Sequence, residues 1–257
     1  MSQLVENFTR EVAKYCEHVP VHNFDYSINI SLKHKYLFVE TPKAGCSTIK
    51  SILQKMELDR PDFVRNEARD LHYREFSPLL RPAQVGSFEQ FVGRPDIFKF
   101  CFTRNPYSRL LSAYLEKICQ NKPPKQNILQ HLGYDPNDIQ RNISFAEFVR
   151  GVCSQAPIQM NPHWRIQFYQ TFRAHIDYDF IGSVENFSHD LPQALARIRP
   201  DFNDFVADEK RHATGSNQKL AEHFTAELVD AVRKTFALDF EHFGHQADFD
   251  RYLSQPQ

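Results

Sequence analysis

Residues 36–56 read YLFVETPKAGCSTIKSILQKM, and this stretch decides the fold class. It opens with four apolar residues, Tyr36 to Val39, a run typical of a buried strand. After the loop, apolar side chains recur at intervals of three and four residues, at Ile49, Ile52, Leu53 and Met56. That spacing predicts a helix that packs on the strand. Strand, loop and helix in this order form the unit of a parallel α/β sheet.

Two further segments repeat the unit. Residues 98–103, FKFCFT, precede Asn105 and Pro106, which suit the N-cap and the first position of a helix. Residues 178–183, YDFIGS, precede a third helix, for which we expect Ser188 to be the cap. Three such units predict an α/β domain whose central sheet is parallel.

Length and composition are typical of a globular domain. A chain of 257 residues, 41% hydrophobic and 25% charged, predicts a globular protein, and we expect a single domain over residues 1–257. Residues 1–30 are expected to form an N-terminal extension, with one helix packed on the outside. The polar stretch 119–141 is expected to be a long connection near an acceptor. The net charge of −1 argues against a nucleic-acid or anionic-membrane binder.

The cysteines and the N-terminus bear on compartment. The odd number of cysteines and their spacing predict a reduced compartment and no metal site. They are Cys16, Cys46, Cys101, Cys119 and Cys153. The first 20 residues carry charges throughout, so we expect neither a signal peptide nor a membrane segment.

The loop TPKAGCST, residues 41–48, has the chemistry of an anion site. A helix N-terminus that follows a strand offers unpaired N–H groups and partial positive charge. Lys43 adds a full charge, and Gly45 lets the backbone approach a ligand. In a Walker A loop the lysine follows the second glycine, whereas Lys43 precedes Gly45, which disfavours an ATP-dependent kinase. From spacing alone, an ordinary turn with a surface lysine remains the alternative.

The same loop resembles the 5′-phosphosulfate loop of sulfotransferases that use 3′-phosphoadenosine-5′-phosphosulfate (PAPS), in the form typical of the Golgi carbohydrate group and its bacterial relatives. Residues 102–114, FTRNPYSRLLSAY, resemble the 3′-phosphate element of that family. Looser matches lie at HWRIQ (163–167), YDFIGSVEN (178–186) and residues 211–217. Together the matches span residues 36–245, the family-like core.

The resemblance implies a three-layer α/β domain with a central parallel sheet, related to P-loop nucleotide kinases. It implies PAPS as donor and 3′-phosphoadenosine-5′-phosphate (PAP) as product. We recognise no histidine or carboxylate cluster typical of a metal site in the sequence, so we expect no metal. The implied cofactor-binding residues are Lys43, Ala44, Gly45, Cys46, Ser47, Thr48, Arg104, Ser112, Arg211, Thr214 and Ser216. The chemistry of Arg104 supports the same role independently of the resemblance, because a guanidinium at the end of a strand can bind a phosphate with two hydrogen bonds.

Sulfuryl transfer to a hydroxyl requires a group that takes the hydroxyl proton. The resemblance points to His72, which lies between the two cofactor loops, and His163 is the rival. Lys43 is the third catalytic candidate, and Glu40 is an outside candidate for the base. Near His163, aromatic side chains either stack on a sugar or belong to the core: Trp164, Phe168 and Tyr169.

The sequence therefore predicts a sulfotransferase that acts on an acceptor hydroxyl, with a family bias toward carbohydrate. Two alternatives stay open: a kinase with a degenerate phosphate loop, and a non-catalytic module that binds a 3′-phosphoadenosine nucleotide. Eukaryotic members of the carbohydrate group sit in the Golgi behind an N-terminal anchor. Since the chain shows none, we expect a cytoplasmic enzyme, with the Golgi lumen as the alternative for a trimmed chain.

Overall fold

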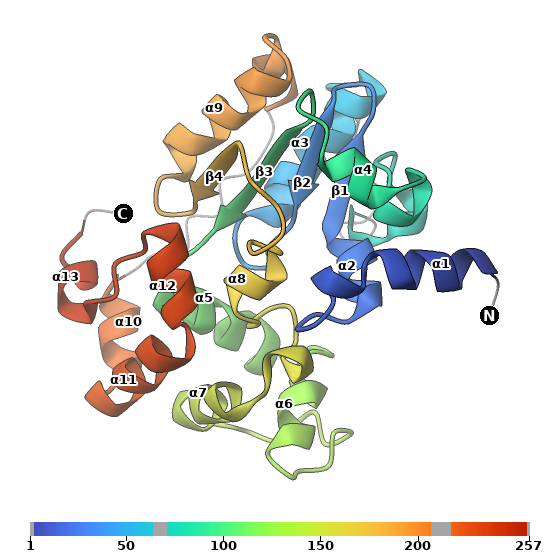
Figure 1. The fold of residues 1–257 in the computed structure, drawn as a ribbon. Helices are drawn as coiled ribbons and strands as arrows, with labels where there is room; N and C mark the ends of the chain where they lie inside the picture. Colours follow the sequence, from blue (N-terminus) through green and yellow to red (C-terminus); the bar gives the residue numbers. More distant parts are fainter. Residues whose placement is uncertain (1–2, 64–70, 207–216, 256–257) are drawn as a thin grey trace.

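The structure is a computed structural model that describes residues 3–63, 71–206 and 217–255. Its centre is a four-stranded sheet in the order β1-β2-β3-β4 (Figure 1). The strands are β1 (Ile28–Ser31), β2 (Tyr36–Val39), β3 (Phe98–Thr103) and β4 (Phe180–Ser183). Strands β2, β3 and β4 run parallel, and β1 pairs antiparallel with β2. The predicted α/β class is confirmed, with one antiparallel strand added at the edge.

The register brings the ends of the parallel strands to one edge of the sheet. Val39 of β2 pairs with Cys101 of β3, and Thr103 pairs with Ser183 of β4. The loops that carry Lys43, Arg104 and residues 184–186 therefore leave the sheet side by side. This is the edge at which open α/β sheets bind their ligands.

One face of the sheet packs on two helices, α3 (Cys46–Leu58) and α9 (Phe187–Ile198). The strands present aromatic side chains to this face at alternate positions, as strand geometry requires. They are Tyr36, Phe38, Phe100 and Phe102, all at most 1% exposed. The predicted helical stripe of α3 meets these rings with Ile49, Ile52, Leu53 and Met56.

The opposite face receives Leu37, Val39 and Cys101 and packs on α2 (Val21–Ser27) and α4 (Phe88–Val92). Helices therefore cover both faces of the sheet, and the expected three-layer architecture is confirmed.

The N-terminal region corrects the expectation of a single outer helix. It contains α1 (Gln3–Glu11), a 3₁₀ turn (Ala13–Tyr15), α2 and the edge strand β1. Val12 and Phe24 are fully buried in the cluster beneath the sheet. The strand escaped prediction because two of its four side chains are polar, yet Asn29 and Ser31 are at most 1% exposed.

Further helices lie beyond the carboxyl ends of the strands (Figure 1), and they form a third apolar cluster. They are α5 (Pro106–Ala113), α6 (Lys125–His131), α7 (Phe145–Ser154), α8 (Gln167–Gln170), α10 (Asn217–His223), α11 (Ala226–Thr235), α12 (Ala237–Phe243) and α13 (Phe249–Leu253). Shorter turns of helix lie at Arg74–Phe76, Pro82–Gln84, Tyr114–Ile118, Pro157–Gln159 and Phe202–Phe205. The long connection expected over residues 119–141 contains one short helix, α6.

The predicted helix caps had two outcomes. Asn105 caps α5 by accepting a hydrogen bond from the Tyr107 N–H, with Pro106 at the first position, as predicted. The prediction for Ser188 is wrong, because α9 already begins at Phe187 and Asn186 is its N-cap residue. Within the described residues, we find no helix long and apolar enough to cross a bilayer.

Candidate active site

The first two predicted loops are in direct contact. The Arg104 guanidinium donates to the Lys43 carbonyl oxygen at 3.4 Å, although the two residues are 61 positions apart. The Gln167 amide holds the Arg104 backbone from the other side, since its Oε1 accepts from the Arg104 N–H and its Nε2 donates to the Arg104 carbonyl. Arg109, 1% exposed, donates to the Pro42 carbonyl at 3.0 Å. Buried polar side chains thus fix both loops against each other.

The backbone of the Lys43 loop has an unusual shape. Lys43 has φ 71° and Gly45 has φ 75°, both in the left-handed region. For lysine this conformation costs roughly 1 kcal/mol, a strain typical of binding loops. Gly45 is the N-cap residue of α3, so the free N–H groups of that helix begin here. The loop therefore has the form of an anion-binding helix N-terminus.

Replacing Gly45 with alanine should destabilise the protein through two effects. A Cβ there would take the unfavourable positive φ and would lie 2.6 Å from the Phe187 ring. Gly133→Ala is the matched control, because Gly133 has φ 79° and nothing within 4 Å of the added Cβ. In urea unfolding we expect Gly45→Ala to lose about 2–3 kcal/mol and Gly133→Ala about 1 kcal/mol. Equal losses would contradict a close contact between the loop and α9.

The Lys43 side chain points to a carboxylate. Its Nζ donates to Glu116 Oε2, and Oε1 of the same carboxylate accepts from Lys117 at 2.7 Å and from Lys122 at 3.3 Å. Glu116 lies in the short π-helix Tyr114–Ile118, a distortion that often marks functional sites. Burial lowers the pKa of Lys43. Burial alone would raise the pKa of Glu116, but its lysine partners outweigh that effect and hold the pKa below its ordinary value.

If the site binds PAP, as the sequence predicts, Glu116→Gln should strengthen that binding to the free protein. The carboxylate competes with an incoming phosphate for Lys43, and its charge repels that phosphate. Removing one charge at contact distance is worth about 1 kcal/mol, so the Kd should fall roughly fivefold in calorimetry. Glu227→Gln is the control, since Glu227 of α11 forms an exposed pair with Arg150 of α7. Weaker binding by Glu116→Gln would contradict the competition.

The second loop presents Arg104. Its Nε donates to Ser108 Oγ at 3.0 Å, and burial lowers the pKa of the guanidinium. The predicted partner, Ser112, is half-buried one turn further along α5. Ser108 and Ser112 are four residues apart, so they lie on the same face of the helix. The structure thus adds Ser108 between the two predicted residues.

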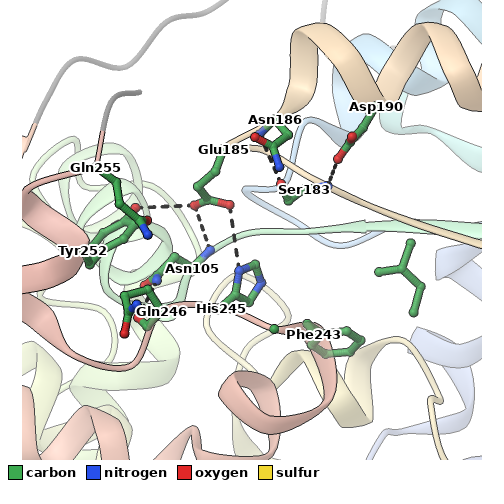
Figure 2. Close-up of a pocket in the computed structure, with 12 residues that line it drawn as sticks. Asn105, Ser183, Glu185, Asn186, Asp190, Phe243, His245, Gln246, Tyr252 and Gln255 are labelled. Carbon is green, nitrogen blue, oxygen red and sulfur yellow. Dashed lines mark hydrogen bonds and ion pairs between the residues drawn. The ribbon is translucent and has the colours of Figure 1, made fainter.

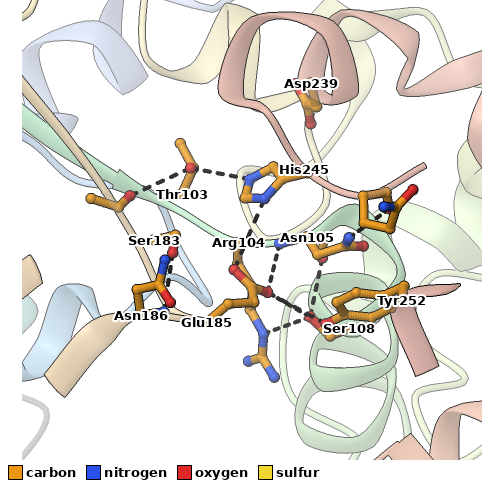
Figure 3. A network of polar contacts seen from close by, with 12 residues as sticks. Thr103, Arg104, Asn105, Ser108, Ser183, Glu185, Asn186, Asp239, His245 and Tyr252 are labelled. Carbon is orange, nitrogen blue, oxygen red and sulfur yellow. Dashed lines mark hydrogen bonds and ion pairs between the residues drawn. The ribbon is translucent and has the colours of Figure 1, made fainter. Parts of the chain in front are cut away.

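Glu185 links this loop to the end of β4. Its Oε1 accepts from the Asn105 N–H at 2.9 Å and lies 3.4 Å from Ser108 Oγ (Figure 3). His245 completes the network, since its Nε2 lies 3.1 Å from Thr103 Oγ1. A pocket of about 630 Å³ opens beside these groups, lined in part by Asn105, Glu185 and His245 (Figure 2).

His72 ends a buried chain of polar groups. Glu40 pairs with Lys50 at 2.7 Å, and both side chains are at most 3% exposed. The Lys50 Nζ lies 2.9 Å from His72 Nδ1, and His72 Nε2 lies 3.2 Å from Ser47 Oγ. Burial, aided by the Lys50 charge, lowers the pKa of His72 to about 4. His72 is therefore neutral near pH 7 and touches the predicted phosphosulfate loop.

His163 is affected by the same charged groups as His72, and we refer to Lys43, His72, His163 and the polar side chains that contact them as the centre. Its Nδ1 lies 2.7 Å from Asn161 Oδ1. Burial lowers its pKa to about 3, with the charges of Lys117 and Lys43 acting in the same direction. The charges of Glu116 and Lys117 affect the pKa of both histidines, and Glu116 also contacts Lys43.

The remaining predicted residues divide into three groups. Ala44, Cys46, Ser47 and Thr48 continue the loop into the first turn of α3, where Cys46 is buried and Ser47 is exposed. Arg211, Thr214 and Ser216 lie outside the described residues. The sugar-stacking interpretation of Trp164 is wrong, because its ring is 0% exposed and its Nε1 donates to Gln155.

Some residues of the candidate site were not predicted. Glu116, Lys50 and Glu185 contact partners far away in the sequence, which are Lys43, His72 and Asn105 respectively. Asn161 instead contacts His163, two residues further along the chain. Asn161 carried one local signal: an Asn two residues before a histidine can accept a hydrogen bond from that residue's N–H. Glu185 lies within YDFIGSVEN, a stretch that resembles the family, whereas for Glu116 and Lys50 we find no local signal in the sequence.

This geometry defines a class of protein: an α/β protein in which a lysine loop and an arginine loop lie in contact at the carboxyl ends of the parallel strands. The chain belongs to the sulfotransferase family, whose model matches residues 26–246. The match begins ten residues before the family-like core predicted from sequence.

Curated relatives carry the name carbohydrate sulfotransferase. The chain is 28% identical to carbohydrate sulfotransferase 14 of Homo sapiens over 230 residues, which are 85% of this chain and 60% of that protein. It is 25% identical to carbohydrate sulfotransferase 9 of Homo sapiens, over 86% of this chain and 54% of that protein. It is 27% identical to carbohydrate sulfotransferase 10 of Pongo abelii, over 95% of this chain and 74% of that protein. The chain thus spans about 60% of the first of these relatives, and no solved structure matches it.

Proposed function

We propose that this protein transfers a sulfuryl group from PAPS to a hydroxyl group of a carbohydrate. One observation carries the proposal: Arg104 of the second loop donates to the backbone of Lys43 in the first. A donor with a phosphosulfate at one end and a 3′-phosphate at the other needs two cationic sites at a fixed separation. Hydrogen bonds from the buried side chains of Gln167 and Arg109 hold the two loops in place.

The residues present fit the donor. Lys43, the α3 N–H groups and the Ser47 hydroxyl suit the phosphosulfate end. Arg104, Ser108 and Ser112 follow one another at intervals of four residues and suit the 3′-phosphate. That phosphate distinguishes PAPS from ordinary adenylates, so this row of side chains would set donor identity.

The reaction needs one proton acceptor and one site for developing charge. The acceptor hydroxyl oxygen bonds to sulfur while the bond from sulfur to the 5′-phosphate oxygen breaks, and PAP leaves. Lys43 and the loop N–H groups stabilise the negative charge that grows on the departing phosphate. The hydroxyl proton passes to a histidine of the centre. From sequence His72 was the first candidate and His163 the second.

The carbohydrate acceptor rests on the names of the relatives, which this chain covers only in part. Phe168 and Tyr169 are half-buried and remain candidates for contact with a sugar ring. A kinase is not favoured, because the loop lacks the Walker arrangement. A non-catalytic nucleotide module would bind PAP and transfer nothing. The cytoplasmic location, with the Golgi lumen as its alternative, stays a prediction.

The function is tested with ³⁵S-labelled PAPS and a panel of monosaccharides, oligosaccharides and unsulfated polysaccharides. We expect label in at least one carbohydrate and PAP formed in equal amount. If PAP binds and no label moves to any acceptor, the binding-module alternative replaces the enzyme. If the protein instead splits ATP in the presence of magnesium, the kinase alternative is favoured.

A further inference from the structure

The two histidines of the centre hold their ring protons on opposite nitrogens. Lys50 is paired with Glu40 at 2.7 Å, and an ammonium group can only donate hydrogen bonds. The His72 Nδ1, 2.9 Å from Lys50 Nζ, must therefore accept. The neutral His72 ring then carries its proton on Nε2, and this N–H points at Ser47 Oγ, 3.2 Å away.

At His163 the pattern is reversed. The His163 backbone N–H donates to Asn161 Oδ1 at 3.1 Å, which identifies that atom as the amide oxygen, because a backbone N–H has no lone pair to offer. The same oxygen lies 2.7 Å from His163 Nδ1, so Nδ1 carries the proton and donates. The neutral His163 ring therefore keeps its lone pair on Nε2.

We propose that His163 Nε2 takes the proton from the acceptor hydroxyl, and that His72 serves as a hydrogen-bond donor at the phosphosulfate loop. This assignment reverses the order expected from sequence, and it rests on the proposed sulfuryl transfer. Asn161 is a positioning residue in this scheme. Its oxygen fixes the tautomer of His163 and stabilises the imidazolium that forms when Nε2 gains the proton.

Lys50 excludes His72 from the same role. If His72 accepted a proton at Nε2, its tautomer would first have to change, and Nδ1 would then carry a hydrogen facing the Lys50 ammonium. The pair with Glu40 holds that ammonium in place in a buried site. As a donor to Ser47, by contrast, His72 already has the geometry it needs.

The segment that carries His163 is rigidly held. Arg109 donates to the carbonyl of Pro162 at 2.9 Å and to that of Arg165 at 2.7 Å, on either side of His163. Arg109 also holds the Pro42 carbonyl of the Lys43 loop. One buried guanidinium therefore sets the position of the histidine relative to the loop.

The charges around His163 come from three elements. Lys117 and Glu116 lie on the π-helix, Lys43 lies on the first loop, and Arg109 lies on α5. Burial has the largest effect on the pKa of His163 and lowers it. The three cations lower this pKa further, whereas Glu116 raises it. Anionic groups of the donor would offset these cations, so the basicity of His163 should rise when the donor is bound.

The tautomers are read directly by two-bond ¹H–¹⁵N correlation spectra of the ¹⁵N-labelled full chain with PAP present. The signals are assigned by their loss in His72→Gln and in His163→Gln. We expect Nε2–H at His72 and Nδ1–H at His163. The opposite tautomer at His163 would overturn the proposal, and this readout does not depend on any transfer activity.

The roles are separated by a matched pair of substitutions. The glutamine amide can replace the Nε2–H donor of His72, but it cannot take a proton in place of His163. With the carbohydrate found in the ³⁵S assay, we expect His163→Gln to lose at least about 100-fold in kcat and His72→Gln less than about 10-fold. PAP titration and thermal unfolding of both variants check that they fold. The reverse order of losses overturns the proposal while leaving the transfer function intact.

Asn161→Asp tests the positioning role. A carboxylate keeps both hydrogen bonds to His163 and adds a negative charge, which favours the imidazolium. The acidic limb of the kcat/KM profile should therefore move to higher pH in this variant. An unshifted profile, with His163→Gln still inactive, would remove Asn161 from the scheme.

Discussion

Lys43→Ala is expected to lower kcat for sulfuryl transfer by about 10²–10³-fold, the loss typical when one group that stabilises transition-state charge is removed from a buried site. The Lys43 side chain is only 14% exposed, so water cannot replace its charge efficiently. The measurement is the initial rate of PAP formation with the carbohydrate found in the ³⁵S assay.

Lys122→Ala is the matched control. Lys122 contacts the same Glu116 carboxylate at 3.3 Å, but its side chain is 41% exposed. If the rate depends on the charge at the loop, Lys122→Ala should keep most of the wild-type activity. Equal losses in both variants would mean that the cluster around Glu116, and not the loop lysine, governs the rate.

Arg104→Ala should weaken the binding of PAP by roughly 100-fold, because a buried charge-assisted contact to phosphate is worth about 2–5 kcal/mol. The binding of AMP, which lacks the 3′-phosphate, should change little. Calorimetry on both nucleotides measures the difference, and Arg150→Ala, in an exposed pair with Glu227, is the control. An equal loss for AMP and PAP would contradict the assignment of Arg104 to the 3′-phosphate.

The parallel core of the fold could be predicted because its signals are local. The apolar runs of β2 and β3, the spacing in α3 and the Asn105-Pro106 cap each lie within a few residues. The edge strand β1 could not be found this way. Its polar side chains are satisfied by distant partners, such as Glu57, which accepts from the Ser31 hydroxyl.

The candidate site could likewise be predicted only where its sequence signals are local. The lysine and arginine loops were recognised from short motifs, and their contact follows from the parallel strand order. The partners Glu116 and Lys50 act across 73 and 22 residues respectively, so no local pattern reveals them. The preference for His72 over His163 as base rested on position between the loops, whereas tautomers depend on hydrogen bonds that only the folded chain forms.

We expect this fold to bind a donor with a 3′-phosphate. Titration of the wild-type protein with PAP, AMP and ATP tests this binding and requires no knowledge of the acceptor. We expect micromolar binding of PAP and at least about 100-fold weaker binding of AMP and ATP. Equal affinity for PAP and AMP, or a preference for ATP, would contradict this expectation.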